Sequence, residues 1–168
     1  MKENYIKSML YAYPHVREVC DQLDEVVLSK ALSSMQNTAP CEEQCLKILE
    51  LTEQKLTVME VKEYVDKVLS KLTDYQKKSL EYKYFKRRPK EYYKGFDYTS
   101  RNFYRSQPII IAKVNKILTQ LGVNDAYFEN KCLKINFFNL MLEKVKYLER
   151  LHSAKTEQNR LEKEDCYS

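Results

Sequence analysis

The chain has 168 residues, of which only two are glycine and four are proline, and its formal net charge is +5. Average usage is about 7% glycine and about 5% proline. The scarcity of both residues predicts a nearly all-helical, all-α protein. The length leaves room for one medium domain, or for a small domain with a helical extension. No segment approaches the roughly 18 apolar residues of a membrane span, and the N-terminal segment lacks a signal-peptide core, so we expect a cytoplasmic protein without membrane contact.

The sequence shows no pattern typical of an enzyme or of a cofactor site. It contains no glycine-rich phosphate loop and no paired His, Cys or Asp constellation. Cys41 and Cys45 could share one helix face, but a structural zinc site takes about four ligands, and His15 and His152 stand at no metal-finger spacing. We therefore expect no catalysis, no cofactor and no metal site, and the odd number of cysteines suits reduced thiols.

Residues 1–71 are predicted to form an N-terminal helical region. Apolar residues recur at helical spacing from Glu3 to about Met35, and Pro14 marks a break or a new helix start. After a polar turn at 36–40, a second helical pattern runs to residue 72. It contains a narrow apolar stripe that needs a partner helix, formed by Val61, Val65, Val68 and Leu72.

Residues 72–122 carry three helix signatures in succession, which together predict a helix-turn-helix. Thr73 and Gln76 fit a capping box at the start of a first helix, which continues to the basic run at 86–88. The segment from Pro89 to Gly95 opens with proline and closes with glycine, as expected of a helix of about two turns. Thr99 is the expected cap of a third helix over 100–107.

Pro108 is expected to kink or end this third helix near Gln107. A proline inside a helix removes one hydrogen bond and clashes with the preceding turn, at a cost of about 3 kcal/mol. The segment from Ile109 to Leu121 is then predicted to be a separate or angled helix, with Gly122 as its stop.

Residues 123–155 are predicted to form a C-terminal helical region. Asp125–Asn130 precedes a long amphipathic segment from Cys132 to about His152. Its apolar stripe is formed by Phe138, Met141, Val145 and Leu148, and Leu142 and Leu151 widen it. We expect this stripe to meet the valine stripe within one chain, although an identical subunit and RNA polymerase are alternative neighbours. The polar run at 156–168 has too little apolar surface to order itself, which predicts a flexible tail.

Positive charge concentrates around the predicted helix-turn-helix. Residues 76–105 carry 10 Lys+Arg and 3 Asp+Glu, a net charge of +7, whereas residues 1–75 carry 9 and 13, a net charge of −4. A patch of this kind attracts phosphate backbones regardless of base sequence, although a solvated lysine-rich face is the plainer interpretation of a charge run alone.

The third helix supplies candidates for contacts with double-stranded DNA. With Thr99 as cap, Phe103 falls one turn into the helix, where it can anchor it to the first two. The exposed N-terminal turns then hold the base-reading candidates Ser100, Arg101, Asn102 and Arg105. The candidates for phosphate contacts are Lys86, Arg87, Arg88, Lys90, Lys94 and Tyr104.

The arrangement LTDYQKKSLEYKYFKRR, a short second helix and then YTSRNFYRSQPIIIAKVNKIL resembles region four of bacterial sigma factors. It looks closest to the ArpU-like and RinA-like phage transcription regulators, over roughly residues 72–121. Their recognition helix often reads as a Ser or Thr cap followed by an aromatic pair and arginine, the places that Thr99, Phe103, Tyr104 and Arg105 occupy here.

The resemblance implies a helical bundle in which long amphipathic helices flank a sigma-like helix-turn-helix. The implied function is sequence-specific regulation of transcription, as a phage late-gene activator, with promoter DNA and RNA polymerase as partners. Two alternatives stay open: a non-enzymatic helical interaction module whose basic face is only solvated or meets an acidic protein, and a phage DNA-packaging small subunit that combines a helix-turn-helix with oligomerising helices. The target site, activation or repression, and assembly as a homo-oligomer also stay open.

Overall fold

The structure is a computed structural model that describes the backbone of residues 1–35, 40–86, 89–97 and 99–165, and, outside 34–35, 90, 155–156 and 158–165, their side chains. The helices are α1 (Glu3–Ala12), α2 (Val16–Met35), α3 (Cys41–Ser70), α4 (Asp74–Leu80), α5 (Arg101–Gln120), α6 (Asp125–Asn130) and α7 (Asn136–Asp165). These ranges contain no strand, and the predicted all-α fold is confirmed. No helix in the described ranges is long and apolar enough to span a membrane.

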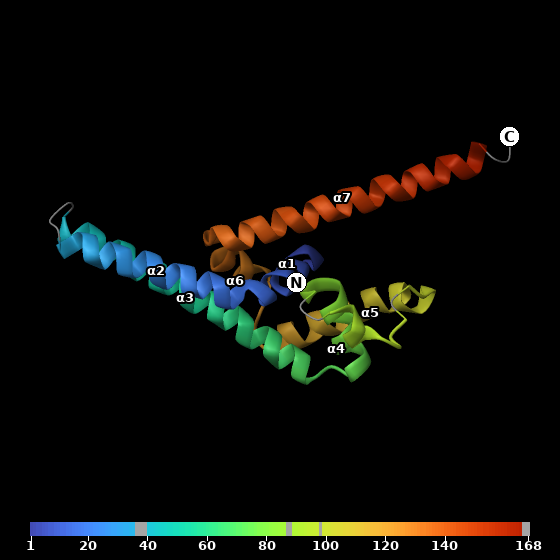
Figure 1. Ribbon diagram of the computed structural model, residues 1–168, viewed down its shortest axis with the longest axis horizontal. Coiled ribbons are helices and arrows are strands. Elements are labelled where there is room, and N and C mark those ends of the chain that lie inside the picture. Colours follow the sequence, from blue (N-terminus) through green and yellow to red (C-terminus); the bar gives the residue numbers. More distant parts are fainter. Residues whose placement is uncertain (36–39, 87–88, 98, 166–168) are drawn as a thin grey trace.

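The short helix α1 is the centre of the fold (Figure 1). Its side chains Ile6, Met9, Leu10 and Ala12 are at most 1% exposed. The helix packs against α7 on one side, and against α3, α5 and the end of the α4 segment on the other. Contact with neighbours on two sides explains why this helix is apolar around much of its circumference.

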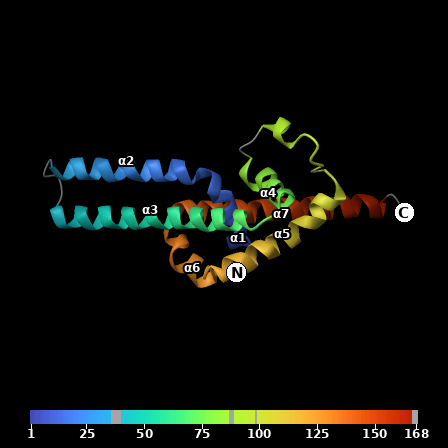
Figure 2. The ribbon, with the colours of Figure 1, turned by 90° about the horizontal axis from the view of Figure 1, so that it is seen from below.

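Helices α2 and α3 form a long antiparallel hairpin that extends away from α1 (Figure 2). Pro14 lies in a single 3-10 turn, Tyr13–His15, between α1 and α2, so the predicted break at this proline is confirmed. The Asp24 carboxylate accepts hydrogen bonds from Lys55 Nζ at 2.6 and 2.7 Å, which joins the two arms of the hairpin. The valine stripe of α3 is buried where the hairpin meets the core.

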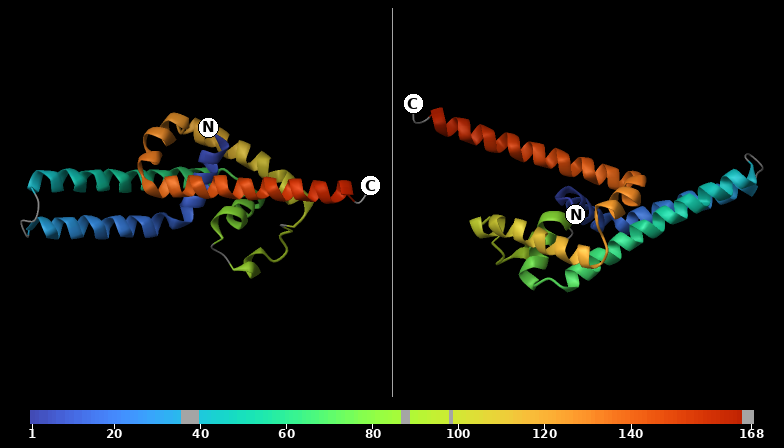
Figure 3. Two further views of the ribbon diagram at one scale, coloured as in Figure 1. Left: turned by 90° about the horizontal axis from the view of Figure 1, so that it is seen from above. Right: turned by 180° about the vertical axis from the view of Figure 1, so that it is seen from behind.

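Helix α7 leaves the core in the direction opposite to the hairpin (Figure 3). Phe138 and Val145 are buried and Met141 is partly buried, whereas Leu148 is 39% exposed. The principal neighbour of this stripe is α1 and not α3, so the predicted direct pairing of the two stripes is wrong. The physical reason is that α1 fills the space between them and offers apolar side chains to both.

Helix α7 is also longer than its apolar pattern suggests. The structure continues it to Asp165, through most of the segment at 156–168 for which the sequence predicts a flexible tail. Residues 166–168 lie outside the described part of the chain.

Candidate nucleic-acid interface

The first helix of the candidate interface begins at the predicted capping box. Thr73 Oγ1 accepts the Gln76 backbone N–H at 3.4 Å, and Gln76 Oε1 accepts the Thr73 backbone N–H at 3.2 Å. Helix α4 then continues as a π-helical turn, Glu81–Phe85, and ends at Lys86, whose φ of 48° is left-handed. Such a residue stops a helix because its backbone turns away from the helical path.

The connection between the two main helices is shorter than predicted. Lys90–Tyr93 forms one 3-10 turn, where the sequence predicts a helix of about two turns from Pro89 to Gly95. Gly95 has a φ of 85°, a conformation that glycine adopts readily, and it redirects the chain before a second turn can form. A helix-turn-helix built on this chain therefore has a second helix of a single turn.

The N-cap of α5 is Ser100 and not Thr99. Ser100 Oγ accepts the Phe103 backbone N–H at 3.2 Å, so the helix begins at Arg101. Thr99 is held by Asp97, whose Oδ1 accepts the Thr99 backbone N–H at 3.2 Å and the Thr99 hydroxyl at 2.9 Å. The prediction failed because the aspartate captures the threonine in a local turn and leaves the next hydroxyl to cap the helix.

Helix α5 continues through Pro108 as one helix, so the predicted end near Gln107 is wrong, and the alternative of a kink at the proline stays a prediction. Pro108 and Tyr104 are both exposed, and the Tyr104 carbonyl receives no hydrogen bond from the proline nitrogen, which carries no hydrogen. Burial of Ile110, Ile111 and Val114 in the core favours the helix beyond the proline.

The end of α5 agrees with the prediction. Gly122 has a φ of 82°, and its N–H donates to Thr119 O at 3.0 Å. The next N–H, of Val123, donates to Leu118 O at 3.0 Å. Together these two bonds form a Schellman motif, which stops the helix at the predicted glycine.

Phe103 anchors α5 to the two segments before it, as predicted. Its ring is 3% exposed, and it contacts Tyr82 edge-on with centroids 5.9 Å apart and Phe96 edge-on at 6.0 Å. One turn later, Gln107 is also buried, at 4% exposure. This side of the helix is therefore fixed against the protein, and the opposite side faces solvent.

The opposite side carries the candidate base-reading residues. Arg101, Asn102 and Arg105 are exposed, and Tyr104 is 64% exposed beside them. No described carboxylate forms an ion pair with either arginine. Ser100 is partly buried and its hydroxyl serves as the cap, which makes it the weakest of the predicted base contacts.

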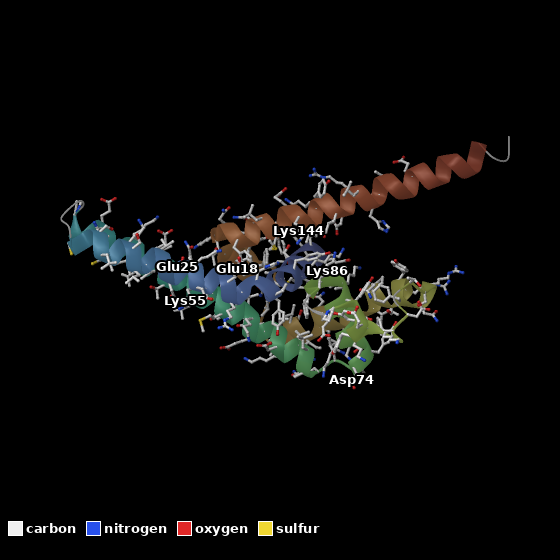
Figure 4. The ribbon with its side chains drawn as sticks, in the orientation of Figure 1. Glu18, Glu25, Lys55, Asp74, Lys86 and Lys144 are labelled. Atoms are coloured by element: carbon white, nitrogen blue, oxygen red, sulfur yellow. The ribbon has the colours of Figure 1, made fainter. Side chains whose placement is uncertain are left out.

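The candidate phosphate contacts are only partly placed. Lys86 and Lys94 are exposed, and Lys86 directly follows the π-helical turn that packs on α1 (Figure 4). Arg87, Arg88 and the side chain of Lys90 lie outside the described residues.

Sequence reasoning missed two lysines further along α5. Lys116 is exposed and follows Arg105 at helical spacing on the same side, and Lys113 Nζ donates to Gln76 Oε1 at 2.9 Å. The expected break at Pro108 separated these lysines from the arginines. A continuous helical wheel from Arg101 onwards would have found them.

The described residues offer no constellation for metal chemistry, since no group of three or more His, Cys, Asp or Glu among them could hold a metal ion. The arrangement suits binding of an extended anion by an exposed helix face. Comparisons of the chain with protein-family models, curated proteins and solved structures returned no match.

Proposed function

We propose that this chain binds double-stranded DNA with the first two turns of α5 in the major groove. One observation carries the proposal: Arg101, Asn102 and Arg105 are exposed together at the start of a helix whose other side is anchored by a buried phenylalanine. Arginine can donate two hydrogen bonds to guanine, and asparagine can pair in the same way with adenine. The N-terminal turns of a recognition helix are the part that reaches base edges.

Electrostatics supports the same interface. The two arginines carry charge that no described carboxylate offsets, and Lys116 extends the positive side of α5 beyond the first turns. Exposed Tyr104 is placed to donate its hydroxyl to a phosphate. Together with the resemblance to sigma region four, this supports a transcription regulator that contacts promoter DNA.

The test is binding to random-sequence duplex DNA at two salt concentrations, followed by fluorescence anisotropy. We expect binding that weakens steeply with salt, because each neutralised phosphate releases counterions. The double variant Arg101→Ala/Arg105→Ala should bind more weakly than the wild type. The matched control Lys47→Ala/Lys62→Ala removes the same charge from α3 and should bind like the wild type.

Each outcome separates the proposals. No binding by the wild type at low salt would leave the interaction module as the better function. Equal losses in both double variants would reduce the effect to net charge and remove α5 from the interface. Transcription from a template that carries the preferred site, with and without this protein, then distinguishes a regulator from a DNA-packaging subunit.

A further inference from the structure

Helix α3 carries a second apolar stripe on the side that faces away from the core. Leu46, Leu49 and Leu56 are 63%, 60% and 57% exposed. With Glu53 they recur at spacings of three, four and three, the heptad pattern of a coiled-coil seam. The buried valines of α3 lie on another side of the helix, so this stripe is left uncovered within the chain. Glu60 continues the spacing, but Tyr127 and Lys131 of the same chain hold its carboxylate. We call residues 46, 49, 53 and 56 the α3 seam.

Helix α7 has a stripe of the same kind. Leu140, Tyr147 and Leu151 are 57%, 60% and 41% exposed, and with Lys144 they also alternate at three and four. The face of α7 that packs on α1 carries Phe138 instead, and Lys144 lies at the border of the two faces, where its Nζ reaches the Tyr11 ring of α1. We call residues 140, 144, 147 and 151 the α7 seam.

The two seams cannot cover each other within one chain. The hairpin and α7 extend from the core in opposite directions, and α1 lies between them (Figures 1 and 2). Exposed apolar stripes of this length mark surfaces that bind another protein.

The charges of the seams are complementary. Glu53 lies among the leucines of the α3 seam and forms no ion pair with a described residue. Lys144 lies in the α7 seam, where its Nζ stands 5.0 Å from the centroid of the Tyr11 ring and meets no described carboxylate. A pair of identical α3 seams would instead place glutamates near glutamates, which is unfavourable.

The C-terminal half of the α3 seam also borders a groove of about 370 Å³. This groove is lined by Glu53, Leu56 and Glu60 of α3, and by Lys134 and Ile135 from the turn before α7. A groove beside an apolar stripe can accept the side chains of an incoming helix.

We propose that the α3 seam binds the α7 seam of a second copy of this chain. The packing is helix against helix, with leucines and Tyr147 in the contact and Glu53 of one copy close to Lys144 of the other. Reciprocal use of both seams would give a closed dimer, and use of one seam per neighbour would give an open chain. This assembly is independent of the proposed DNA interface, because neither seam includes a residue from the first turns of α5.

The experiment is sedimentation velocity of the full chain over a range of micromolar concentrations, with Leu49→Asp in one seam and Leu151→Asp in the other. We expect the wild type to associate and each variant alone to be monomeric. An equimolar mixture of the two variants should associate again, more weakly than the wild type, because the α7 seam of the first fits the α3 seam of the second. Ile109→Asp, at an exposed apolar site on α5 outside both seams, is the control and should associate like the wild type.

Other outcomes overturn the proposal. A wild type that stays monomeric would remove the interface altogether. Loss of association with Leu49→Asp but not with Leu151→Asp would show contact between two α3 seams, and the reverse would show contact between two α7 seams. Circular dichroism must show wild-type helix content for each variant, which is expected because the replaced side chains are exposed. If one variant unfolds, the charge reversals Glu53→Lys and Lys144→Glu, singly and mixed, replace it in the same design.

Discussion

Lys113 of α5 donates a hydrogen bond from Nζ to Gln76 Oε1 of α4 over 2.9 Å. The same oxygen accepts the backbone N–H of Thr73. Gln76 therefore completes the capping box of α4 and also joins α4 to α5. The relative position of the two helices therefore depends on a local capping motif.

The first prediction concerns this glutamine. Gln76→Ala removes both side-chain contacts and keeps the bond from its backbone N–H to Thr73 Oγ1, so it should destabilise the protein by about 1–2 kcal/mol, the usual range for two lost hydrogen bonds. Gln76→Glu keeps an acceptor for Thr73 and pairs a negative charge with Lys113, so its stability should match or exceed the wild type. Urea unfolding of the three proteins measures the difference. A Gln76→Ala protein as stable as the wild type would show that neither contact matters.

The second prediction contrasts two adjacent aromatic residues. Phe103 is 3% exposed and Tyr104 is 64% exposed. Phe103→Ala should lower the free energy of unfolding by about 3–5 kcal/mol, because it opens a cavity between α5 and its neighbours. Tyr104→Ala should leave stability nearly unchanged and weaken DNA binding. Thermal melts and anisotropy titrations of both variants test this, and a reversed pattern would mean that the helix faces are assigned wrongly.

The third prediction concerns the proline inside α5. Pro108→Ala supplies a backbone N–H for the Tyr104 carbonyl and removes the clash, effects worth about 3 kcal/mol in a helix interior. The greater freedom of the unfolded chain offsets part of this gain, by about 1 kcal/mol. We expect net stabilisation of about 2 kcal/mol by denaturant unfolding. Destabilisation instead would indicate that the helix needs the proline for its packing.

The fourth prediction separates base contacts from phosphate contacts. Arg101→Ala should cost about 1–3 kcal/mol at the preferred DNA site and little on random DNA, as expected for a base-reading side chain. Asp97 offers no competing ion pair, since no described carboxylate pairs with Arg101 and the Asp97 Oδ1 holds Thr99. Site selection from a random pool with both proteins is the measurement. Enrichment of one identical motif by both would move the readout toward Arg105.

The fifth prediction concerns thiol reactivity. Burial raises the pKa of the Cys132 thiol to about 12, whereas Cys41 is exposed. The thiolate is the reactive form, so a raised pKa leaves almost none of it at neutral pH. Iodoacetamide should label Cys41 in the native protein and Cys132 only after unfolding. Peptide mass spectrometry reads each site, and rapid native labelling of Cys132 would contradict its burial.

The features predicted correctly from the sequence depend on neighbours along the chain. The Thr73–Gln76 capping box and the stop at Gly122 each involve a few consecutive residues, so the local pattern contains all the partners. The buried position of Phe103 follows from its helical phase. The exposed arginines beside it follow from the same phase.

The errors arose where two local signals compete or where the partner is distant. Thr99 and Ser100 compete as the cap of α5, and the sequence does not show that Asp97 holds Thr99 and leaves the cap to Ser100. Pro108 is unfavourable by local rules, yet burial of the apolar side chains that follow it in the core keeps the helix continuous.

The sequence by itself determined that the chain is helical, where several of its helices start and stop, and which side of α5 is apolar. These properties depend on composition, caps and periodicity. The tertiary structure alone decided which apolar face of each helix packs against which neighbouring helix. Helices α3 and α7 are each apolar on two sides, so periodicity cannot say which side the core takes. Helix α1 packs on one side of each with its buried residues Ile6, Met9, Leu10 and Ala12, and the exposed seams are what it leaves uncovered.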